Sequence, residues 1–316
     1  MDIGVYFASL KLSQLAGAMP GAISQGLIWG IMALGIYITY KILDIADLTV
    51  DGSICTGASV CAILLLNGQS LWLAMLIAVL AGMATGFITG ILHTAMGIPA
   101  ILSGILTQLA LYSINLMIMG KANQSLNANN MDLLVSLGKV KSTNLLENPL
   151  FVVGVFIVVI IAVLYWFFGT ELGASLRATG ANQNMSRAQG INTSRTIVLG
   201  LMISNGLVAL SGALLAQYQG FADINMGRGA IVIGLAAVII GGALFNKIFR
   251  NFAMKMVGVV LGAVIYYIVL QFVLWLKLDA NYLKLLSATV VAIFLAVPYW
   301  KKKYAQSHVK GDATNA

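Results

Sequence analysis

The chain has 316 residues, of which 60% are hydrophobic and 9% are charged, and its formal net charge is +8. Soluble domains carry about 25% charged residues, so this composition excludes a soluble globular domain. Apolar runs that continue for about 20 residues exclude a closed β-barrel, whose strands alternate between apolar and polar residues. The basic residues lie mostly in short loops and in the tail, where they set membrane topology and do not form a nucleic-acid surface.

The apolar segments predict an all-α polytopic membrane protein with about nine transmembrane or re-entrant helices. Residues 1–18 are expected to form an interfacial helix, residues 19–300 a single transmembrane domain, and residues 301–316 a basic, disordered tail. The segment 230–243 is short and glycine-rich, so we expect a broken or re-entrant helix that protein buries. The segments are 21–40, 49–66, 71–91, 98–119, 150–168, 197–217, 230–243, 256–276 and 282–299.

The turn after the first segment contains Lys41, Asp44, Asp47 and Asp51. Spacings of three and four residues place these side chains on one face if the turn is helical. They then form either a contact with a partner or a gate. The alternative, which we prefer, is a solvated turn in which Asp47 caps the second segment.

No group of residues in the sequence points to an enzyme, a metal or a cofactor. Cys55 and Cys61 lie six residues apart in one helical segment, where they cannot form a disulfide or a metal pair. His93 lies at a helix end and His308 in the tail. The stretch Gly52–Ser59 lacks the lysine of a phosphate-binding loop, so any ATP hydrolysis must occur on another subunit.

Glycines recur at every fourth position in two segments, at Gly26 and Gly30 and again at Gly82, Gly86 and Gly90. Such stripes allow helix backbones to approach closely within a membrane. They predict helix packing inside the chain, with a dimer contact as the alternative.

Uncharged polar residues inside the spans are candidates for a substrate pathway, because their side chains can hydrogen-bond a passing solute. More often such residues bond a neighbouring helix. The candidates are Gln108, Asn115, Ser204 and Asn205.

The polar, basic loop 171–195 separates two long apolar segments. Residues 171–179 can continue the fifth span as helix, which Gly180 then ends. Asn182 is a good N-cap and Gly190 suits the position after a helix, so residues 182–189 are expected to form a short helix. Thr193 or Ser194 can cap the next span. Short helices are marginal in water, so one specified at both ends suggests packing against a partner, whereas a merely solvated loop is the alternative.

A shift of 176 residues aligns two parts of the chain. Gly30 falls on Gly206, and the phrase ADLTV, which contains Asp47, falls on ADINM, which contains Asp223. The first span of the second copy comes five spans after the first span of the first copy. Five is an odd number, so the copies, about 20–120 and 197–300, have opposite orientations in the membrane. Such inverted repeats are a transporter architecture.

The basic residues predict the orientation in the membrane. If every segment crosses, the clusters Arg177/Arg187/Arg195, Lys247/Arg250/Lys255 and Lys301/Lys302/Lys303 all lie in the cytoplasm. The N-terminus and the asparagine-rich loop 120–148 then lie outside, with the C-terminus inside.

Three stretches resemble permease subunits of the branched-chain amino-acid/ribose family of ABC importers. RATGANQNMSRAQGIN, which begins at Arg177, is similar to the family's cytoplasmic loop, and IGLAAVIIGG (Ile233–Gly242) is similar to its Ala-Val-x-x-Gly-Gly segment. The stretch Gly26–Val60 resembles the family's first span, turn and second span. The resemblance covers residues 20–300 and looks nearest to amino-acid permeases of the tryptophan/tyrosine type. Relatives often have Pro-Glu near Gln183 and Asn184, so one charged contact is missing here.

The resemblance implies a bacterial plasma-membrane permease, working as a homodimer with two cytoplasmic ATP-binding subunits and an extracytoplasmic solute-binding protein. It makes the loop a coupling helix, with Met185 as an exposed apolar tip, and it makes Asp223 and Arg228 candidates for contacting the binding protein unless they pair with each other. The ATPase-contact residues are Arg177, Gly180, Asn182, Met185, Arg187 and Gly190.

The sequence therefore predicts the permease subunit of an ATP-driven importer for a small polar solute, with an amino acid as first choice and sugars or nucleosides behind it. An ion-driven secondary transporter fits the repeat but normally needs intramembrane carboxylates. A passive channel lacks a filter motif here, and a scaffold needs no repeat.

Overall fold

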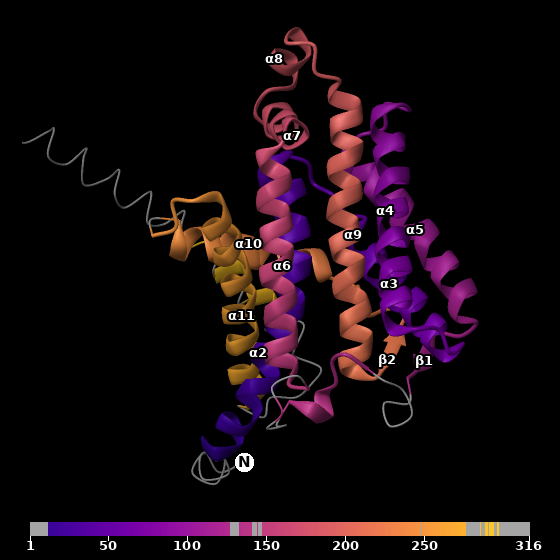
Figure 1. Cartoon of the computed structure of the whole chain (residues 1–316), viewed down its shortest axis with the longest axis vertical. Helices are drawn as coiled ribbons and strands as arrows, with labels where there is room; N and C mark the ends of the chain where they lie inside the picture. Colours follow the sequence, from indigo (N-terminus) through magenta and orange to yellow (C-terminus); the bar gives the residue numbers. More distant parts are fainter. Residues whose placement is uncertain are drawn as a thin grey trace, which may run out of the picture.

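The computed structural model describes residues 12–126, 133–140, 144, 147–246 and 248–275, together with 285, 288, 289, 291–293 and 296. Long helices run along one direction, with the short helices α7 and α8 at one end and the two-stranded sheet β1–β2 at the other (Figure 1). The elements are α2 (Leu12–Ile36), the π-helix η1 (Tyr37–Ile42), α3 (Val50–Leu66), α4 (Leu71–Thr94), α5 (Ala100–Met119), β1 (Asn123–Ser125), the 3₁₀ turn η2 (Leu137–Lys139), α6 (Pro149–Gly169), α7 (Glu171–Ala181), α8 (Gln183–Ala188), α9 (Thr193–Gln219), β2 (Phe221–Asp223), α10 (Ala230–Phe245) and α11 (Phe252–Trp275).

Among the described residues, six helices are long and apolar enough to cross a membrane, and α3 and α10 are shorter apolar helices. Eight of the predicted segments are therefore helices, and the all-α polytopic fold is confirmed. The ninth segment, 282–299, lies mostly outside the described residues, as do residues 1–11 and the tail 301–316. Residues 12–18 are the first turns of α2 and belong to the first span, so the described part of the predicted interfacial helix is not separate from it.

Two hydrogen bonds between α2 and α9 confirm the inverted repeat. The Ser204 hydroxyl donates to the Gly35 carbonyl, and the Ser211 hydroxyl donates to the Ile28 carbonyl, both at 2.8 Å. The shift of 176 residues exchanges the two residue pairs, because Ile28 falls on Ser204 and Gly35 on Ser211, although α9 supplies the donor in both bonds. Such reciprocal contacts are those of two antiparallel helices related by a two-fold axis, so the two copies point in opposite directions.

The glycine stripes pack helices of one repeat against helices of the other. A Cβ added at Gly82 or Gly86 in α4 would overlap the backbone of α9, and one added at Gly30 would lie 3.0 Å from Val260 of α11. Gly206, the counterpart of Gly30, packs in the same way against Met83 of α4. The prediction that these glycines serve packing inside the chain is confirmed.

The short helix α10 begins inside the protein, beside α3. The Asp51 carboxylate of α3 accepts hydrogen bonds from the backbone N–H groups of Gly229, at 3.0 Å, and of Ile231, at 2.9 Å. Gly229 has a φ of 84°, and its own residue type offers no capping side chain. A side chain from the opposite repeat therefore supplies the cap that helix N-termini need.

Replacing Asp51 by asparagine is expected to lower the free energy of unfolding by about 1–2 kcal/mol, because one acceptor oxygen and the favourable charge at the N-terminus of α10 are lost. Thermal unfolding in detergent measures the change. Asp44→Asn is the matched control, because Asp44 is exposed and also carries a carboxylate in the same region. Equal melting temperatures for the two variants would contradict the capping role.

Candidate functional site

The loop between α6 and α9 folds into two short helices at one end of the molecule (Figure 1). The prediction that residues 171–179 continue the fifth span is wrong: α6 ends at Gly169, and Thr170 has the extended backbone of an N-cap and accepts a hydrogen bond from the Gly173 N–H. The extended backbone at Thr170 separates α7 from α6, so α7 is a separate helix and not a continuation of the span.

The predicted caps of the short helix α8 are confirmed. The Asn182 side chain accepts from the Met185 N–H at 3.0 Å, and Gly190 follows the helix with a φ of 82°. The next span is capped by Asn192, whose side chain accepts from the Arg195 N–H at 3.1 Å, and not by Thr193 or Ser194. Asparagine competes with serine and threonine as an N-cap, and the cap lies one residue earlier than predicted.

The tip of this end carries an exposed apolar side chain on α8, the helix that also contains Arg187. Met185 is 60% exposed, although a side chain of its size normally packs in a core. Arg187 is exposed and its Nε donates to the Thr193 hydroxyl at 2.8 Å, which fixes the guanidinium beside α8. Arg177 is exposed on α7 and borders a hollow with Phe252. An exposed apolar side chain on a capped helix that also carries Arg187 is a surface suited to contact with another protein.

Gly180 has a different role from the predicted one. It lies inside α7, which continues to Ala181, and a Cβ there would overlap the carbonyl of Ile42 and approach Leu43. The backbone of α7 therefore rests directly on the residues that join η1 to α3. The one indication of this contact in the sequence is a glycine, Gly180, inside a helical stretch, since such a glycine often marks close packing.

The turn that follows Leu43 buries Asp47 and leaves Asp44 exposed, so the prediction that Asp47 lies in a solvated turn is wrong. Asp47 is only 3% exposed, because its carboxylate accepts from the Thr49 N–H at 2.9 Å and from the Asn205 amide at 2.7 Å. The Asn205 side chain in turn accepts from the Ser53 hydroxyl at 2.6 Å. Asp47 does bond a backbone N–H just before α3, as expected, but the turn is not helical, so the acidic residues share no face.

Two candidates for a substrate pathway lie on α5 and two on α9, and Asn115 and Asn205 contact the adjacent residues Gly52 and Ser53 of α3. Ser204 and Asn205 bond neighbouring helices, at Gly35 and Asp47. Asn115 is buried on α5 and its amide lies 3.5 Å from the Gly52 carbonyl, whereas Gln108 is half-buried on the same helix. A pathway role stays a prediction for all four residues.

Asp223 lies in β2, at the end of the molecule opposite α8 (Figure 1), whereas Arg228 lies between Gly227 and Gly229, which pack against Asp51 in the first turn of α3. The Asp223 carboxylate accepts from the Asn225 N–H at 2.7 Å and from the Asn123 amide at 3.2 Å. Among the described residues Arg228 is exposed and has no ion-pair partner, so the alternative in which the two pair with each other does not hold. Their contact with a binding protein stays a prediction.

Comparisons with known proteins agree with this architecture. The family described as branched-chain amino acid transport system, permease component, matches residues 19–296. A tyrosine transport system permease protein from Clostridioides difficile (strain R20291) is 44% identical over 282 residues, which are 88% of this chain and 91% of that protein. The autoinducer 2 import system permease protein LsrC of Salmonella typhimurium is 28% identical over 202 residues, 61% of this chain and 55% of that protein.

A solved structure described as an inward-facing conformation of a metal-chelate type ABC transporter has a similar fold. The TM-score is 0.51 at 16% sequence identity, and the match covers 89% of this chain and 86% of that one. The family match spans far more than half of the sequence. The chain therefore belongs to the branched-chain amino-acid transport system permease family and is a membrane-spanning permease subunit of an ABC transporter.

Proposed function

We propose that this chain is the permease of an ATP-driven importer and that α8 is the helix through which an ATPase subunit moves it. The observation that carries the proposal is the exposed Met185 on a helix capped at both ends by Asn182 and Gly190. A six-residue helix gains little stability by itself in water, so this geometry is maintained for contact. Arg177 and Arg187 would orient the partner around the apolar tip.

The proposed assembly has two copies of the permease, two cytoplasmic ATP-binding subunits and one extracytoplasmic solute-binding protein in a bacterial plasma membrane. The end with α8 faces the cytoplasm in this proposal, because Arg177, Arg187 and Arg195 gather there. The N-terminus and β2 with Asp223 then face outside, where a binding protein can dock, and the exposed side chain of Arg228 would have to reach that protein from deeper in the molecule. The C-terminal tail lies in the cytoplasm.

Movement of α8 would reach the membrane domain through α7. Gly180 places the α7 backbone against Ile42, at the end of η1, and the next residues lead to the buried carboxylate of Asp47. When the ATPases close, the displacement of α8 would be passed to the junction of η1 and α3. Solute would cross between the two permease subunits.

An amino acid, with tyrosine or another aromatic amino acid first, is the proposed solute. The tyrosine transport permease of Clostridioides difficile supports this choice by its 44% identity. The autoinducer 2 permease LsrC shows that other solutes occur among more distant relatives. Candidate binding proteins and labelled solutes identify the substrate directly.

Met185→Glu is expected to abolish co-purification with the ATPase and solute-dependent ATP hydrolysis, because a carboxylate cannot enter an apolar cleft without losing its hydration. Arg187→Glu is expected to weaken both at least about tenfold, since a reversed charge at a contact costs well over 1 kcal/mol. Both are measured in lipid with binding protein and solute present.

The controls separate contact from local folding. Arg250→Glu reverses an exposed charge in the loop after α10, and Thr193→Val removes the hydrogen bond of Arg187 while keeping its charge. Both should keep the ATPase bound. Solute uptake on an ion gradient, with no ATPase association of the wild type, would overturn the proposal in favour of a secondary transporter.

A further inference from the structure

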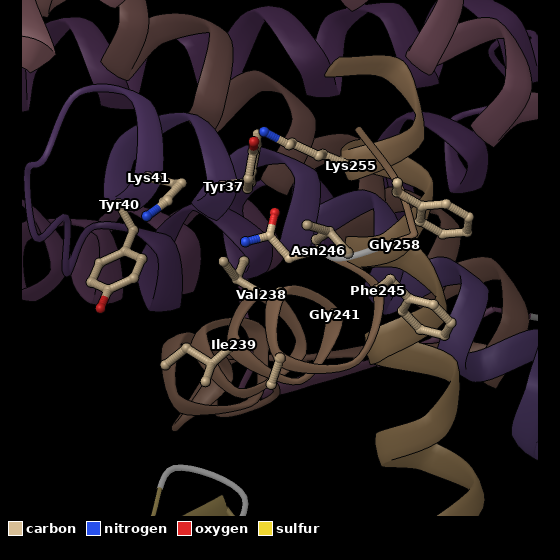
Figure 2. Close-up of a pocket in the computed structure, with 14 residues that line it drawn as sticks. Tyr37, Tyr40, Lys41, Val238, Ile239, Gly241, Phe245, Asn246, Lys255 and Gly258 are labelled. Carbon is tan, nitrogen blue, oxygen red and sulfur yellow. The ribbon is translucent and has the colours of Figure 1, made fainter. Parts of the chain in front are cut away.

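A pocket of about 550 Å³ lies between η1, the end of α10 and the start of α11 (Figure 2). We call it the η1–α10 pocket. Its polar wall contains Tyr37, Lys41, Asn246 and Lys255, and the apolar wall is formed by α10. The lining residues are Tyr37, Tyr40, Lys41, Val238, Ile239, Gly241, Gly242, Ala243, Phe245, Asn246, Phe249, Lys255, Gly258 and Val259.

The charged residues that line this pocket are all positive. No aspartate or glutamate is among its lining residues, and neither Lys41 nor Lys255 has an ion-pair partner within the part of the chain that the structure describes. Figure 2 shows the two lysine side chains on different helices, with the end of Lys255 beside Tyr37 and the amino group of Lys41 on the side of Tyr40. Because no carboxylate lines the pocket, its two ammonium groups favour the binding of an anion. A free amino acid fits poorly, because its own ammonium group would find no acidic partner.

The pocket lies at the depth of a membrane surface. Lys41 is the last residue but one of the span Ser13–Ile42, and Lys255 is in the first turn of the span Phe252–Trp275. These two span ends lie at the end of the molecule where Ile42 contacts Gly180. Lysines at span ends extend to the headgroup level, where they attract anionic lipids.

The apolar wall supplies the second half of an amphipathic site. Val238 and Ile239 line it below the lysines, and Gly242 leaves it open, since a Cβ there would meet no atom within 4 Å. A ligand with a phosphate and hydrocarbon next to it would match both walls. An inorganic anion would leave the apolar wall in contact with water.

We propose that the η1–α10 pocket binds the phosphate headgroup of an anionic phospholipid from the leaflet on the side of α7 and α8. The π-helical backbone of η1 forms one wall of the pocket, and η1 ends at Ile42. A bound lipid would hold the segment on which α7 rests. The site needs only a bilayer surface at this end, so it stands whether or not α8 docks an ATPase.

The test is lipid binding by the purified full chain, measured by native mass spectrometry with phosphatidylglycerol or phosphatidylcholine added. Each lysine near a membrane surface contributes about 1 kcal/mol, which is a factor of about five in affinity. Lys41→Gln and Lys255→Gln should each weaken phosphatidylglycerol binding about fivefold, and the double variant about 25-fold. Arg250→Gln, at the same end but outside the pocket, should bind as the wild type does.

A second variant guards against misfolding of the lysine variants. Gly242→Leu keeps both charges and fills the open wall, and it should also lose the lipid. Retention of phosphatidylglycerol by the double lysine variant, or equal binding of phosphatidylcholine by the wild type, overturns the proposal. Displacement of the lipid by millimolar inorganic phosphate also overturns it, because the site would then take a soluble anion.

Discussion

Solute uptake by the Gly180→Ala variant is expected to fall about tenfold, with a loss of about 1–3 kcal/mol in the free energy of unfolding. A Cβ at this position would overlap the Ile42 carbonyl, and both partners are backbone, so no flexible side chain can move aside. Helix α7 must then withdraw from the junction of η1 and α3. Uptake into proteoliposomes and thermal unfolding measure the two effects.

Gly154→Ala is the matched control, since Gly154 lies in α6 and a Cβ there would meet no atom within 4 Å. Alanine favours a helix over glycine by about 1 kcal/mol, so this variant should be as stable as the wild type or more so. If Gly180→Ala binds the ATPase and transports like Gly154→Ala, the contact with Ile42 does not transmit motion. ATPase binding with uncoupled hydrolysis is the expected signature.

Replacement of Asn205 by leucine is expected to cost about 3 kcal/mol, because the buried Asp47 carboxylate loses its amide donor and the Ser53 hydroxyl loses its acceptor. The side chains have similar size, so the loss reports hydrogen bonding and not volume. Thermal unfolding and the amount of chain in the membrane are the measurements.

The exchange variant Asp47→Asn/Asn205→Asp tests the pairing, since it keeps one amide and one carboxylate in contact. It should recover part of the stability that Asn205→Leu loses. Gln108→Leu is the control, because Gln108 is only half-buried and has no hydrogen bond to the described residues. A cost for Gln108→Leu equal to that of Asn205→Leu would argue against a special role for the pair.

The sequence alone predicted the helical architecture, the repeat and the α8 caps, because these rest on local patterns. Long apolar runs define spans, and Asn182 and Gly190 act within a few residues of themselves. The glycine stripe of α4 was predicted to pack inside the chain, but its partner, α9, appeared only in the structure. Local sequence patterns predict that a residue packs or caps a helix, whereas the identity of its partner depends on tertiary contacts.

The contacts of Asp47, Asp51 and Gly180 could not be predicted because each joins residues distant in the chain. Asp47 was expected to be solvated in a short turn, but the turn packs against α9 and buries the carboxylate beside Asn205. Asp51 caps a helix that starts about 180 residues later. Polar residues at segment ends look alike in sequence whether water or another helix completes their hydrogen bonds.

The exchange of contacts between the repeats has a mechanical consequence. Helix α2 of the first copy packs against α10 and α11 of the second, and α9 of the second packs against α3 and α4 of the first. The first helix of each copy is therefore packed mainly against helices of the other copy. A rigid rocking of one copy against the other, as in some transporters, would break these contacts. We therefore expect a change in access to come from tilting whole subunits against each other or from bending single helices.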